Sequence, residues 1–399
     1  MKACVLALNI GSSSIKLAVF DAATQAPLLR ANVTRIAKGA RATASTRAAS
    51  AERVAAPMPA PSDTKEAVHW LLQALHERRP EVRVVGVGHR VVHGGVSFER
   101  PVRIDAAVLN RLEALAVLAP AHQPIEIAII EQMQGLLPGL PQVACFDTAF
   151  HHTQPKLQRW FALPRALSES GIVRVGFHGL SYEYIAGVLP GIAGARPYRK
   201  VIVSHLGSGS SACAMYDRRS VSSTMGFTPL DGMMMGTRCG AIDPGVLLYL
   251  QQQRGMAVDA LADLLGNQSG LLGVSGVSDN VEVLEASTDP RASEALEMFA
   301  ERAAAAIAAQ CVALAGLEAL VFTGGIGEHD ATMRTRICSR LQWLGVSLDA
   351  SANAAHAQHI STADSRIDVY VIPTDEEAVI ARATAALLDA SERGGDSIG

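Results

Sequence analysis

Apolar residues recur along the chain with two spacings, one typical of strands and one typical of helices. Short apolar runs bounded by turn residues predict strands at Val5–Leu8, Ile15–Phe20, Val82–Val87, Val143–Phe146, Val201–Ser204, Ser211–Met215, Ala319–Phe322 and Asp368–Ile372. Apolar positions three and four residues apart predict helices at Thr64–Arg78, Ala106–Val117, Ile125–Leu136, Pro244–Gln253, Ala257–Leu265, Arg291–Ala315, Ala331–Leu341 and Glu376–Ser391. Strands that alternate with helices predict an α/β fold with layered sheets.

The opening pattern of strand, Gly/Ser turn and strand returns near the middle of the chain. The turn Gly11–Ser14 corresponds to Gly207–Ser210, and each follows an apolar strand and precedes another. Two such hairpins half a chain apart predict an internal duplication, with one copy in each of two domains. A length of 399 residues also favours two domains.

Composition excludes several classes of protein. The net charge is −3 and the pI is near 6.5, so a basic footprint for nucleic acid is not expected. No apolar run is long enough to predict a membrane-spanning helix, and the first residues lack the features of a signal peptide. The six cysteines form no C-x-x-C pair and are expected to be reduced, which predicts a cytoplasmic protein. The Ala-, Ser- and Pro-containing stretch Ala37–Ser62 is expected to be an exposed, mobile excursion.

Three glycine-rich turns follow apolar strands, at Gly11–Ser14, Gly207–Ser210 and Gly324–Gly327. Glycine lets the backbone approach an anion and direct several N–H groups at it, and the third turn is expected to lead into a helix whose N-terminus favours phosphate. None of the three is a P-loop or a dinucleotide fingerprint. One such turn alone is read more simply as a tight structural turn, whereas three together predict a polyphosphate cradle.

Charged residues in apolar or turn contexts add candidate chemistry. Arg90 and Arg238 stand beside glycines, where a guanidinium can bind a carboxylate or phosphate with two parallel bonds, although each could also be a surface ion pair. Asp147 ends an apolar strand and could equally form an Asx turn. Glu376 opens the last helix, where it would also complement the helix dipole, and His122 and His178 could be satisfied core histidines.

Several segments carry a specific resemblance. Asn9–Lys16 resembles the N-x-G-S-S-S-x-K signature of the acetate and propionate kinase family, and Gly176–Ser181 is similar to its second signature. Further family blocks are resembled, in family order over essentially the whole chain, by Gly88–Gly95, Phe146–His151, Met225–Leu230, Gly236–Arg238 and Phe322–Glu328. On these motifs the chain is identified as a member of that family.

The resemblance implies two duplicated actin-like, ribonuclease H-like domains with a cleft that closes on substrates. Residues 1–149 plus 378–399 would form the domain on the acyl and phosphate side, and residues 150–377 the domain that binds nucleotide and forms a homodimer. The implied reaction is reversible phosphoryl transfer between ATP and acetate, giving acetyl phosphate and ADP. Propionate is an expected second substrate, and Mg²⁺, with Mn²⁺ as an alternative, the expected metal.

The resemblance also implies roles for individual residues. Arg90 and Arg238 would hold the carboxylate and the moving phosphoryl group, His178 would donate to that group, His122 would support the site, and Asp147 would orient the nucleophile or a metal-bound water. The acyl pocket would contain Arg90, Val92, Ala121, Phe177 and Pro229, and the metal ligands would be Asn9 and Glu376. Nucleotide and phosphate contacts would come from Ser12, Ser14, Lys16, His205, Gly207, Ser208, Gly209, Asp279, Asn280, Gly324, Gly325, Ile326 and Gly327.

The chain departs from the family pattern at several positions. Ser208, Asn280, Asp375 and Glu282 stand where Asn, Asp, Asn and Arg are usual, and these exchanges bear on nucleotide binding. Tyr182 stands where His is usual. Ala241 and Gly324 replace Asp and Ala, and Ala121 replaces a Leu beside His122, which predicts a larger acyl pocket that accepts propionate.

Two other classes of function remain open from the sequence. A propionate, butyrate or sugar kinase shares the superfamily, but a sugar kinase needs a polar pocket and an Asp base, whereas Val92, Phe177 and Pro229 favour an apolar tail. A non-catalytic actin-like ATPase would not need Arg90, Arg238 and His178 together.

Overall fold

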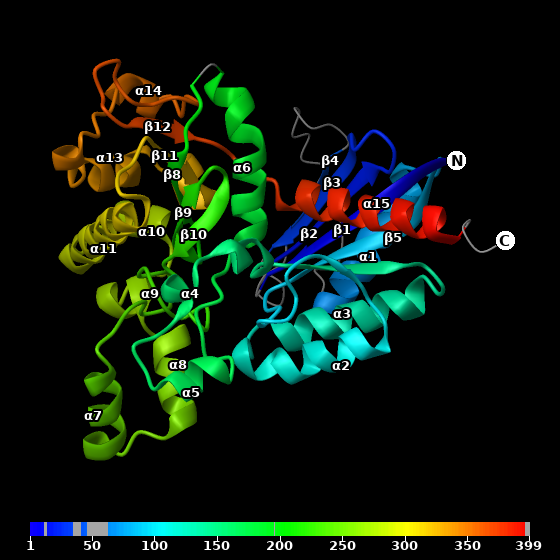
Figure 1. The fold of residues 1–399 in the computed structure, drawn as a ribbon, viewed down its shortest axis with the longest axis horizontal. Helices are drawn as coiled ribbons and strands as arrows, with labels where there is room; N and C mark the ends of the chain where they lie inside the picture. Colours follow the sequence, from blue (N-terminus) through cyan, green and yellow to red (C-terminus); the bar gives the residue numbers. More distant parts are fainter. Residues whose placement is uncertain (12–13, 35–40, 46–62, 195, 396–399) are drawn as a thin grey trace. The chain divides into compact units, whose positions relative to one another are not determined.

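The computed structural model describes residues 1–11, 14–34, 41–45, 63–194 and 196–395. The chain forms two compact units (Figure 1). The first contains Met1–Phe150 and Asp375–Gly399, and the second contains His151–Thr374. Each unit is built around one sheet.

The sheet of the first unit has the order β4-β3-β2-β1-β5-β7-β6. Its strands are β1 (Lys2–Ile10), β2 (Ser14–Asp21), β3 (Pro27–Thr34), β4 (Arg41–Ser45), β5 (Val82–Val91), β6 (Val102–Arg103) and β7 (Gln142–Phe146). Strands β1 to β4 form an antiparallel meander, whereas β1, β5 and β7 run parallel. The carboxyl ends of the three parallel strands therefore lie at one edge, where a binding site is expected in sheets of this kind.

Both faces of this sheet are covered by helices. Leu6 and Leu8 of β1 point into an apolar core formed with α1 (Thr64–Arg78) and α3 (Gln123–Leu136). Helix α15 (Glu376–Gly395) runs along β1 and β5 (Figure 1). Because β1 is buried on both faces, its sequence is a nearly continuous run of apolar residues rather than an alternation of apolar and polar residues.

Gly88 shows why α15 can lie so close to β5. A Cβ atom at this position would fall 2.2 Å from Thr384 Oγ1 and 2.5 Å from Ile380 Cγ2, both on α15. Only a residue without a side chain fits there, so α15 is packed directly on the strand that carries Arg90.

The sheet of the second unit has the order β10-β9-β8-β11-β12. Its strands are β8 (Lys200–Leu206), β9 (Ser210–Tyr216), β10 (Arg219–Ser223), β11 (Ala319–Thr323) and β12 (Asp368–Val371). Strands β8, β9 and β10 are antiparallel, and β8, β11 and β12 are parallel. This repeats the pattern β3-β2-β1-β5-β7 of the first unit, which confirms the predicted α/β class and the internal duplication.

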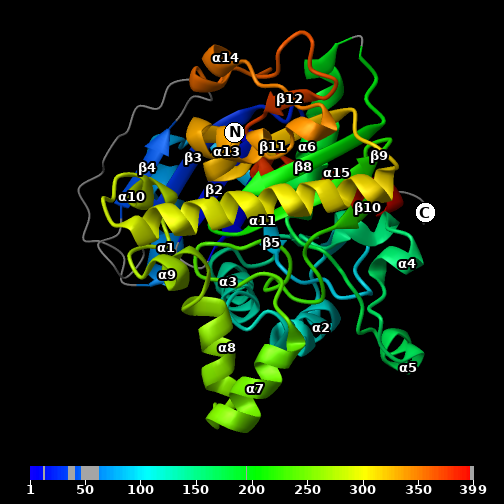
Figure 2. The same ribbon diagram turned by 90° about the vertical axis from the view of Figure 1, so that its left-hand side faces the viewer.

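The core of the second unit lies between this sheet and α11 (Pro290–Leu314), the long helix in front of β8 and β10 in Figure 2. Ala300, Ala303 and Ala304 of α11 are buried, while Val312 on the opposite face is exposed. The predicted Ala-rich buried helix is therefore amphipathic. Small side chains let the helix approach the strands closely.

The remaining helices connect or flank these layers. They are α2 (Ala106–Leu115), α4 (Lys156–Arg159), α5 (Arg165–Glu169), α6 (Gly179–Ala193), α7 (Pro244–Arg254), α8 (Val258–Asn267), α9 (Gly270–Ser275), α10 (Val281–Glu285), α12 (Gly324–His329), α13 (Ala331–Ser339) and α14 (Ala350–Ala354). Short 3-10 turns occupy Ala116–Leu118, Ala149–Thr153 and Gln342–Leu344.

Three local predictions need correction. Part of the predicted excursion Ala37–Ser62 is the strand β4, which pairs with β3; the rest lies outside the described residues. Arg90 lies within β5 rather than after it, because parallel pairing with β7 continues to Val91. The turn Gly324–Gly327 does not precede a helix but forms the first turn of α12.

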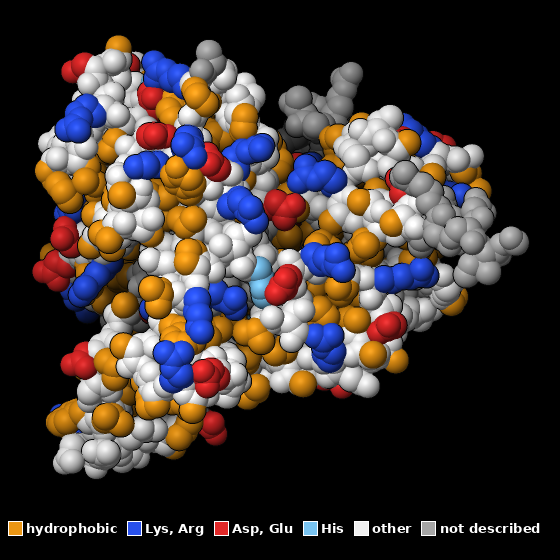
Figure 3. Space-filling model, viewed as in Figure 1, with side chains coloured by type: hydrophobic (Ala, Val, Ile, Leu, Met, Phe, Trp, Pro, Cys, Tyr) orange, Lys and Arg blue, Asp and Glu red, His pale blue; other side chains and the backbone are white. Residues whose placement is uncertain are grey.

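Among the described residues, no helix combines the length and the apolar character needed to cross a bilayer. Lys and Arg side chains are interspersed with Asp and Glu over the face shown in Figure 3. Apolar side chains are exposed on α7 and α8, where Leu248, Tyr249 and Val258 are 54%, 50% and 68% exposed.

Candidate functional site

In the first unit, predicted residues meet at the carboxyl ends of the parallel strands. Asn9 is near the end of β1, Arg90 near the end of β5, and Asp147 directly follows β7. Parallel pairing in this register brings the three strand ends together, so side chains far apart in the sequence become neighbours.

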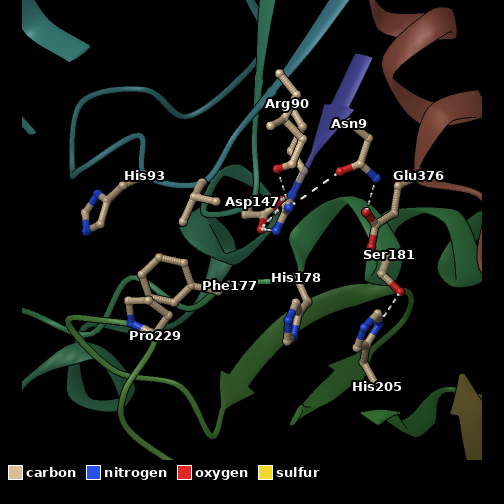
Figure 4. Close-up of polar contacts among 12 residues, drawn as sticks. Asn9, Arg90, His93, Asp147, Phe177, His178, Ser181, His205, Pro229 and Glu376 are labelled. Carbon is tan, nitrogen blue, oxygen red and sulfur yellow. Dashed lines mark hydrogen bonds and ion pairs between the residues drawn. The ribbon is translucent and has the colours of Figure 1, made fainter. Parts of the chain in front are cut away.

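Arg90 and Asp147 form a bidentate ion pair (Figure 4). Arg90 Nε donates to Asp147 Oδ1 at 3.0 Å, and Arg90 Nη2 donates to Asp147 Oδ2 at 2.7 Å. The third guanidinium nitrogen faces Asn9 Oδ1 at 3.4 Å and the carbonyl oxygen of Ile10 at 3.3 Å. Burial opposes the charge of Arg90, but Asp147 outweighs it and the pKa of Arg90 is raised.

The Asn9 side chain links this pair to the start of α15. Its amide nitrogen donates to Glu376 Oε2 and to Glu377 Oε1, both at 2.8 Å. Burial raises the pKa of Glu377, an effect that the charge of Lys16 opposes. Arg90, Asn9 and Glu376 therefore form one connected polar cluster with Asp147 (Figure 4).

The charge of Asp375 is neutralised within the first unit. Arg30 forms a bidentate ion pair with its carboxylate, and Asp375 Oδ1 also accepts from the N–H of Ala378 in the first turn of α15. The Asn-to-Asp departure at this position therefore does not leave a bare negative charge beside Glu376.

The acyl-pocket candidates of the first unit lie in different surroundings. Val92 is buried, whereas Ala121 is exposed and His122 stands at the N-cap position of α3 without a side-chain capping hydrogen bond. The N–H of Val92 donates to Glu126 Oε2 at 3.0 Å. Burial raises the pKa of Glu126 to about 8, so this carboxyl is largely protonated at neutral pH.

The hairpin turn of the first unit is only partly described. Ser12 lies outside the described residues, and Ser14 begins β2. Lys16 pairs with Asn9 across the hairpin and is exposed.

In the second unit, His178 is held in a left-handed backbone conformation with φ of 57°, at the N-cap of α6. A non-glycine residue rarely adopts this conformation, and such positions cluster at functional sites. His178 Nδ1 is 2.7 Å from Ser211 Oγ, and its ring stacks on that of His205 with centroids 4.2 Å apart. His205 Nδ1 is in turn 2.9 Å from Ser181 Oγ (Figure 4).

The Nε2 edge of the His178 ring lies beside the Gly/Ser turn between β8 and β9. A Cβ atom built on Gly209 would lie 3.1 Å from both His178 Nε2 and Arg238 Nη2. Two nitrogens from distant segments therefore converge on one point beside this turn. Arg238 Nη1 donates to the carbonyl oxygen of Pro229 at 2.8 Å, which brings two further predicted residues together.

A cavity of about 740 Å³ opens on the same turn. It is lined by the predicted nucleotide residues Gly207, Ser208, Asp279, Asn280, Gly325 and Ile326. Four carboxylates also line it, those of Asp279, Glu282, Glu285 and Asp330, and its lining includes no Lys or Arg. Burial, followed by the charge of Asp330, raises the pKa of Glu285.

Two of the predicted nucleotide residues have structural contacts of their own. Asn280 caps α10 by accepting from the N–H of Val283 at 3.2 Å. The N–H of Gly324 donates to Glu328 Oε1 at 2.8 Å, and the N–H of Thr374 donates to the same oxygen at 3.1 Å. Phe177 is buried, and its carbonyl oxygen contacts His151 Nε2 at 2.9 Å.

Sequence reasoning assigned no role to the residues that hold these groups in place. Ser211 and Glu377 are common polar residues without a motif of their own, and Ser181 is the last residue of the segment Gly176–Ser181 that resembles the second signature. Ser211 follows the Gly/Ser turn and Glu377 follows Glu376, so proximity to a candidate was the only available signal. The partners of buried polar groups have to be found in the structure.

Comparisons with known proteins give one result. The model of the Acetokinase family matches residues 4–382. An acetate kinase of Rhodopseudomonas palustris is 47% identical, covering 98% of this chain and 99% of its own length, and a propionate kinase of Citrobacter rodentium is 42% identical, covering 95% of each. The crystal structure of a propionate kinase from Francisella tularensis superposes with a TM-score of 0.87 at 37% identity, covering 96% of this chain and 99% of its own. As the sequence motifs predicted, the chain belongs to the acetokinase family.

Proposed function

We propose that this protein is an acetate kinase that transfers the γ-phosphoryl group of ATP to the carboxylate of acetate, reversibly giving acetyl phosphate and ADP. The observation that carries the proposal is the convergence of His178 Nε2 and Arg238 Nη2 beside the Gly/Ser turn of β8 and β9. Family membership and the acetate kinase of Rhodopseudomonas palustris support it.

The proposed reaction does not need a strong base, but it needs positive charge beside the reacting groups. A carboxylate is already a nucleophile, so the obstacle is to bring one anion against another. Arg238 and His178 would bind the phosphoryl oxygens as charge shifts among them, while Arg90 would bind the carboxylate of the acid. Backbone N–H groups of the turn Gly207–Ser210 would hold the remaining phosphates.

Arg90 has to exchange partners to act in this way. In the structure its guanidinium is occupied by Asp147. We propose that Asp147 keeps the guanidinium oriented and charged, and releases part of it when the acid binds. A buried arginine with a preformed partner needs little reorganisation to receive a carboxylate.

The first-unit cluster fits Mg²⁺. Its candidate ligands, Glu376 and Asn9, carry oxygen atoms, which a hard cation prefers. Asn9 would have to turn its amide to offer that oxygen, because in the structure its nitrogen donates to Glu376. No three His, Cys, Asp or Glu side chains gather as a metal site among the described residues, and Mg²⁺ needs few protein ligands because phosphates and water complete its shell. When bound, the ion would neutralise part of the charge of the nucleotide tail.

The substrate is tested by trapping the product. Hydroxylamine converts an acyl phosphate to a hydroxamate, so purified protein with ATP and Mg²⁺ is assayed against acetate, propionate, butyrate and glycerol. Acetate should be used, glycerol should give no hydroxamate, and propionate should be used comparatively well because Ala121 enlarges the proposed acyl pocket. No hydroxamate with any acid would reject the proposed function. Propionate hundreds of times poorer than acetate would reject only the role of Ala121.

We propose that the two compact units correspond to the two expected domains and that the chain forms a homodimer through the second. Exposed apolar side chains on α7 and α8, among them Leu248, Tyr249 and Val258, support such an interface. Light scattering should give twice the chain mass, and Leu248→Glu together with Tyr249→Glu should give the single mass. The six free cysteines support a reducing compartment, in agreement with a cytoplasmic enzyme.

A further inference from the structure

A chain of three hydrogen-bonding groups ends at His178. The hydroxyl of Tyr182 is hydrogen-bonded to Ser211 Oγ, and Ser211 Oγ is 2.7 Å from His178 Nδ1. Tyr182 is near the start of α6 and Ser211 is on β9, and both side chains are fully buried. The three groups therefore connect the helix that carries His178 with the strand that follows the Gly/Ser turn.

The acidities of these three groups determine which group donates in each of the two hydrogen bonds. A phenol has a pKa near 10 and is a stronger donor than an aliphatic hydroxyl. The Tyr182 hydroxyl therefore donates to Ser211, and the Ser211 hydroxyl uses its own proton toward His178 Nδ1. A nitrogen that accepts a hydrogen bond carries no proton, so the proton of the neutral imidazole is on Nε2.

Nε2 is the nitrogen that the proposed reaction needs. It faces the point beside Gly209 on which Arg238 Nη2 also converges. A proton on Nε2 makes it a hydrogen-bond donor toward a phosphoryl oxygen at that point, whereas a proton on Nδ1 would leave a lone pair that repels the oxygen.

The ring of His178 is also fixed in its plane. It stacks on the ring of His205 with an interplanar angle of 19°. Ser181 Oγ, one residue before Tyr182, holds His205 Nδ1 at 2.9 Å. The first turn of α6 thus controls both rings of the stack.

We propose that Tyr182 is a positioning residue that acts through Ser211 to keep the proton of His178 on Nε2. The proposal rests on the proposed function only in that His178 donates to the phosphoryl group. It assigns a role to a residue that departs from the family motif, and it explains why a buried phenol is placed behind a serine at this site.

The experiment compares Tyr182→Phe with Tyr198→Phe. The first change removes one hydroxyl and keeps the aromatic ring, which also packs edge-on against His151 with centroids 5.6 Å apart. Tyr198 is a matched control because its hydroxyl donates to Asp368 and contacts Tyr370 on the other side of the same unit. Both full-length variants are checked by thermal unfolding.

The first readout is the ring of His178 in ¹⁵N-histidine-labelled protein without substrates. Two-bond proton–nitrogen correlations distinguish the two tautomers, and His178→Gln identifies the signal. The wild type and Tyr198→Phe should show the Nε2–H form, and Tyr182→Phe a mixture. A wild-type ring protonated on Nδ1, or the same pure tautomer in Tyr182→Phe, would overturn the proposal.

The second readout is kinetic. Tyr182→Phe should lower kcat about tenfold with KM for acetate nearly unchanged, and Ser211→Ala should lower it at least as much. Ser211→Thr, which keeps the hydroxyl, should retain more activity than Ser211→Ala. Equal kcat in Tyr182→Phe and the wild type would contradict the positioning role. The wild type could make no acyl phosphate while the tautomer of His178 still differs between the wild type and Tyr182→Phe. In that case the proposed function fails and the positioning role of Tyr182 stands.

Discussion

The hairpins β1–β2 and β8–β9 occupy the same place in two sheets of the same strand order, but the groups beside them are held differently. Beside β1–β2, charged side chains form ion pairs, as Arg90 does with Asp147 and Arg30 with Asp375. Beside β8–β9, hydroxyl groups contact His178 and His205, and a carbonyl group accepts from Arg238. Removing one member of a buried ion pair leaves the other charge buried without that pair and lowers the free energy of unfolding. Removing one member of a neutral contact lowers it less. The same topology therefore predicts different responses to mutation.

The largest effect is expected for activity at the second hairpin. Arg238→Ala should lower kcat by on the order of 10³-fold, because an arginine that stabilises the phosphoryl transition state contributes about that much. Its unfolding midpoint should stay near that of the wild type. Steady-state kinetics with acetate and ATP measure the effect, and Arg199→Ala, which breaks an exposed pair with Asp217, serves as the control. Near-wild-type turnover of Arg238→Ala would refute the role.

The next effect is expected for stability at the first hairpin. The sequence alone predicts that Arg90→Ala affects turnover far more than folding. The structure changes this expectation, because the Asp147 side chain is only 2% exposed and would lose the guanidinium of Arg90. Arg90→Ala should lower the free energy of unfolding by roughly 3 kcal/mol, and adding Asp147→Ala should restore part of it. Equal unfolding midpoints in denaturant for Arg90→Ala and Arg238→Ala would remove the contrast between the two hairpins.

A smaller effect depends on pH. Burial raises the pKa of Glu126 from 4.5 to about 8 in the folded protein. Between these values the folded state retains a proton that the unfolded state has lost, so this group's contribution to stability is present below pH 4.5 and is lost as pH rises toward 8. Glu126→Gln removes this titration. The free energy of unfolding of Glu126→Gln minus that of the wild type should therefore be larger at pH 8 than at pH 5, by about 1 kcal/mol or more. Parallel stability curves for the two proteins across this range would contradict the shift.

The smallest effect concerns the acidic cavity of the second unit. Glu282→Arg should lower KM for ATP severalfold with little change in kcat, because it replaces a negative charge in the cavity lining by a positive one. Val283→Arg is the control, since Val283 is half-exposed on the same helix and does not line the cavity. The same decrease in KM for both variants would show a general charge effect.

The sequence predicted the fold well where patterns are local. The helix α1 was predicted with the observed bounds, and the other predicted elements differ from the observed ones by a few residues at their ends. The strands β3, β4, β6 and β10 and several short helices were not predicted. Helix α6 was missed because Gly187, Pro190 and Gly191 resemble a loop, although the structure contains them near its end. Strand β4 was missed because its alternation is weak and its pairing with β3 is a tertiary effect.

The candidate site was predictable as a set of residues but not as a network. Motifs located Arg90, Asn9 and Glu376, yet no local pattern shows that Asn9 joins the other two, because its partner Glu376 is distant in the sequence. Likewise, the charge of Asp375 is compensated by Arg30, which is distant from it in the sequence. Charge compensation between distant residues is decided by the fold, and a sequence pattern does not contain it.

The packing of Gly88 against α15 has a consequence for the biosynthesis of the chain. A ribosome releases β1 to β7 first, then all of His151–Thr374, and only then the helix that covers the open face of the first sheet. The later unit can complete its core while the earlier one still exposes apolar strands. The first unit therefore cannot complete its core until translation has passed through α15.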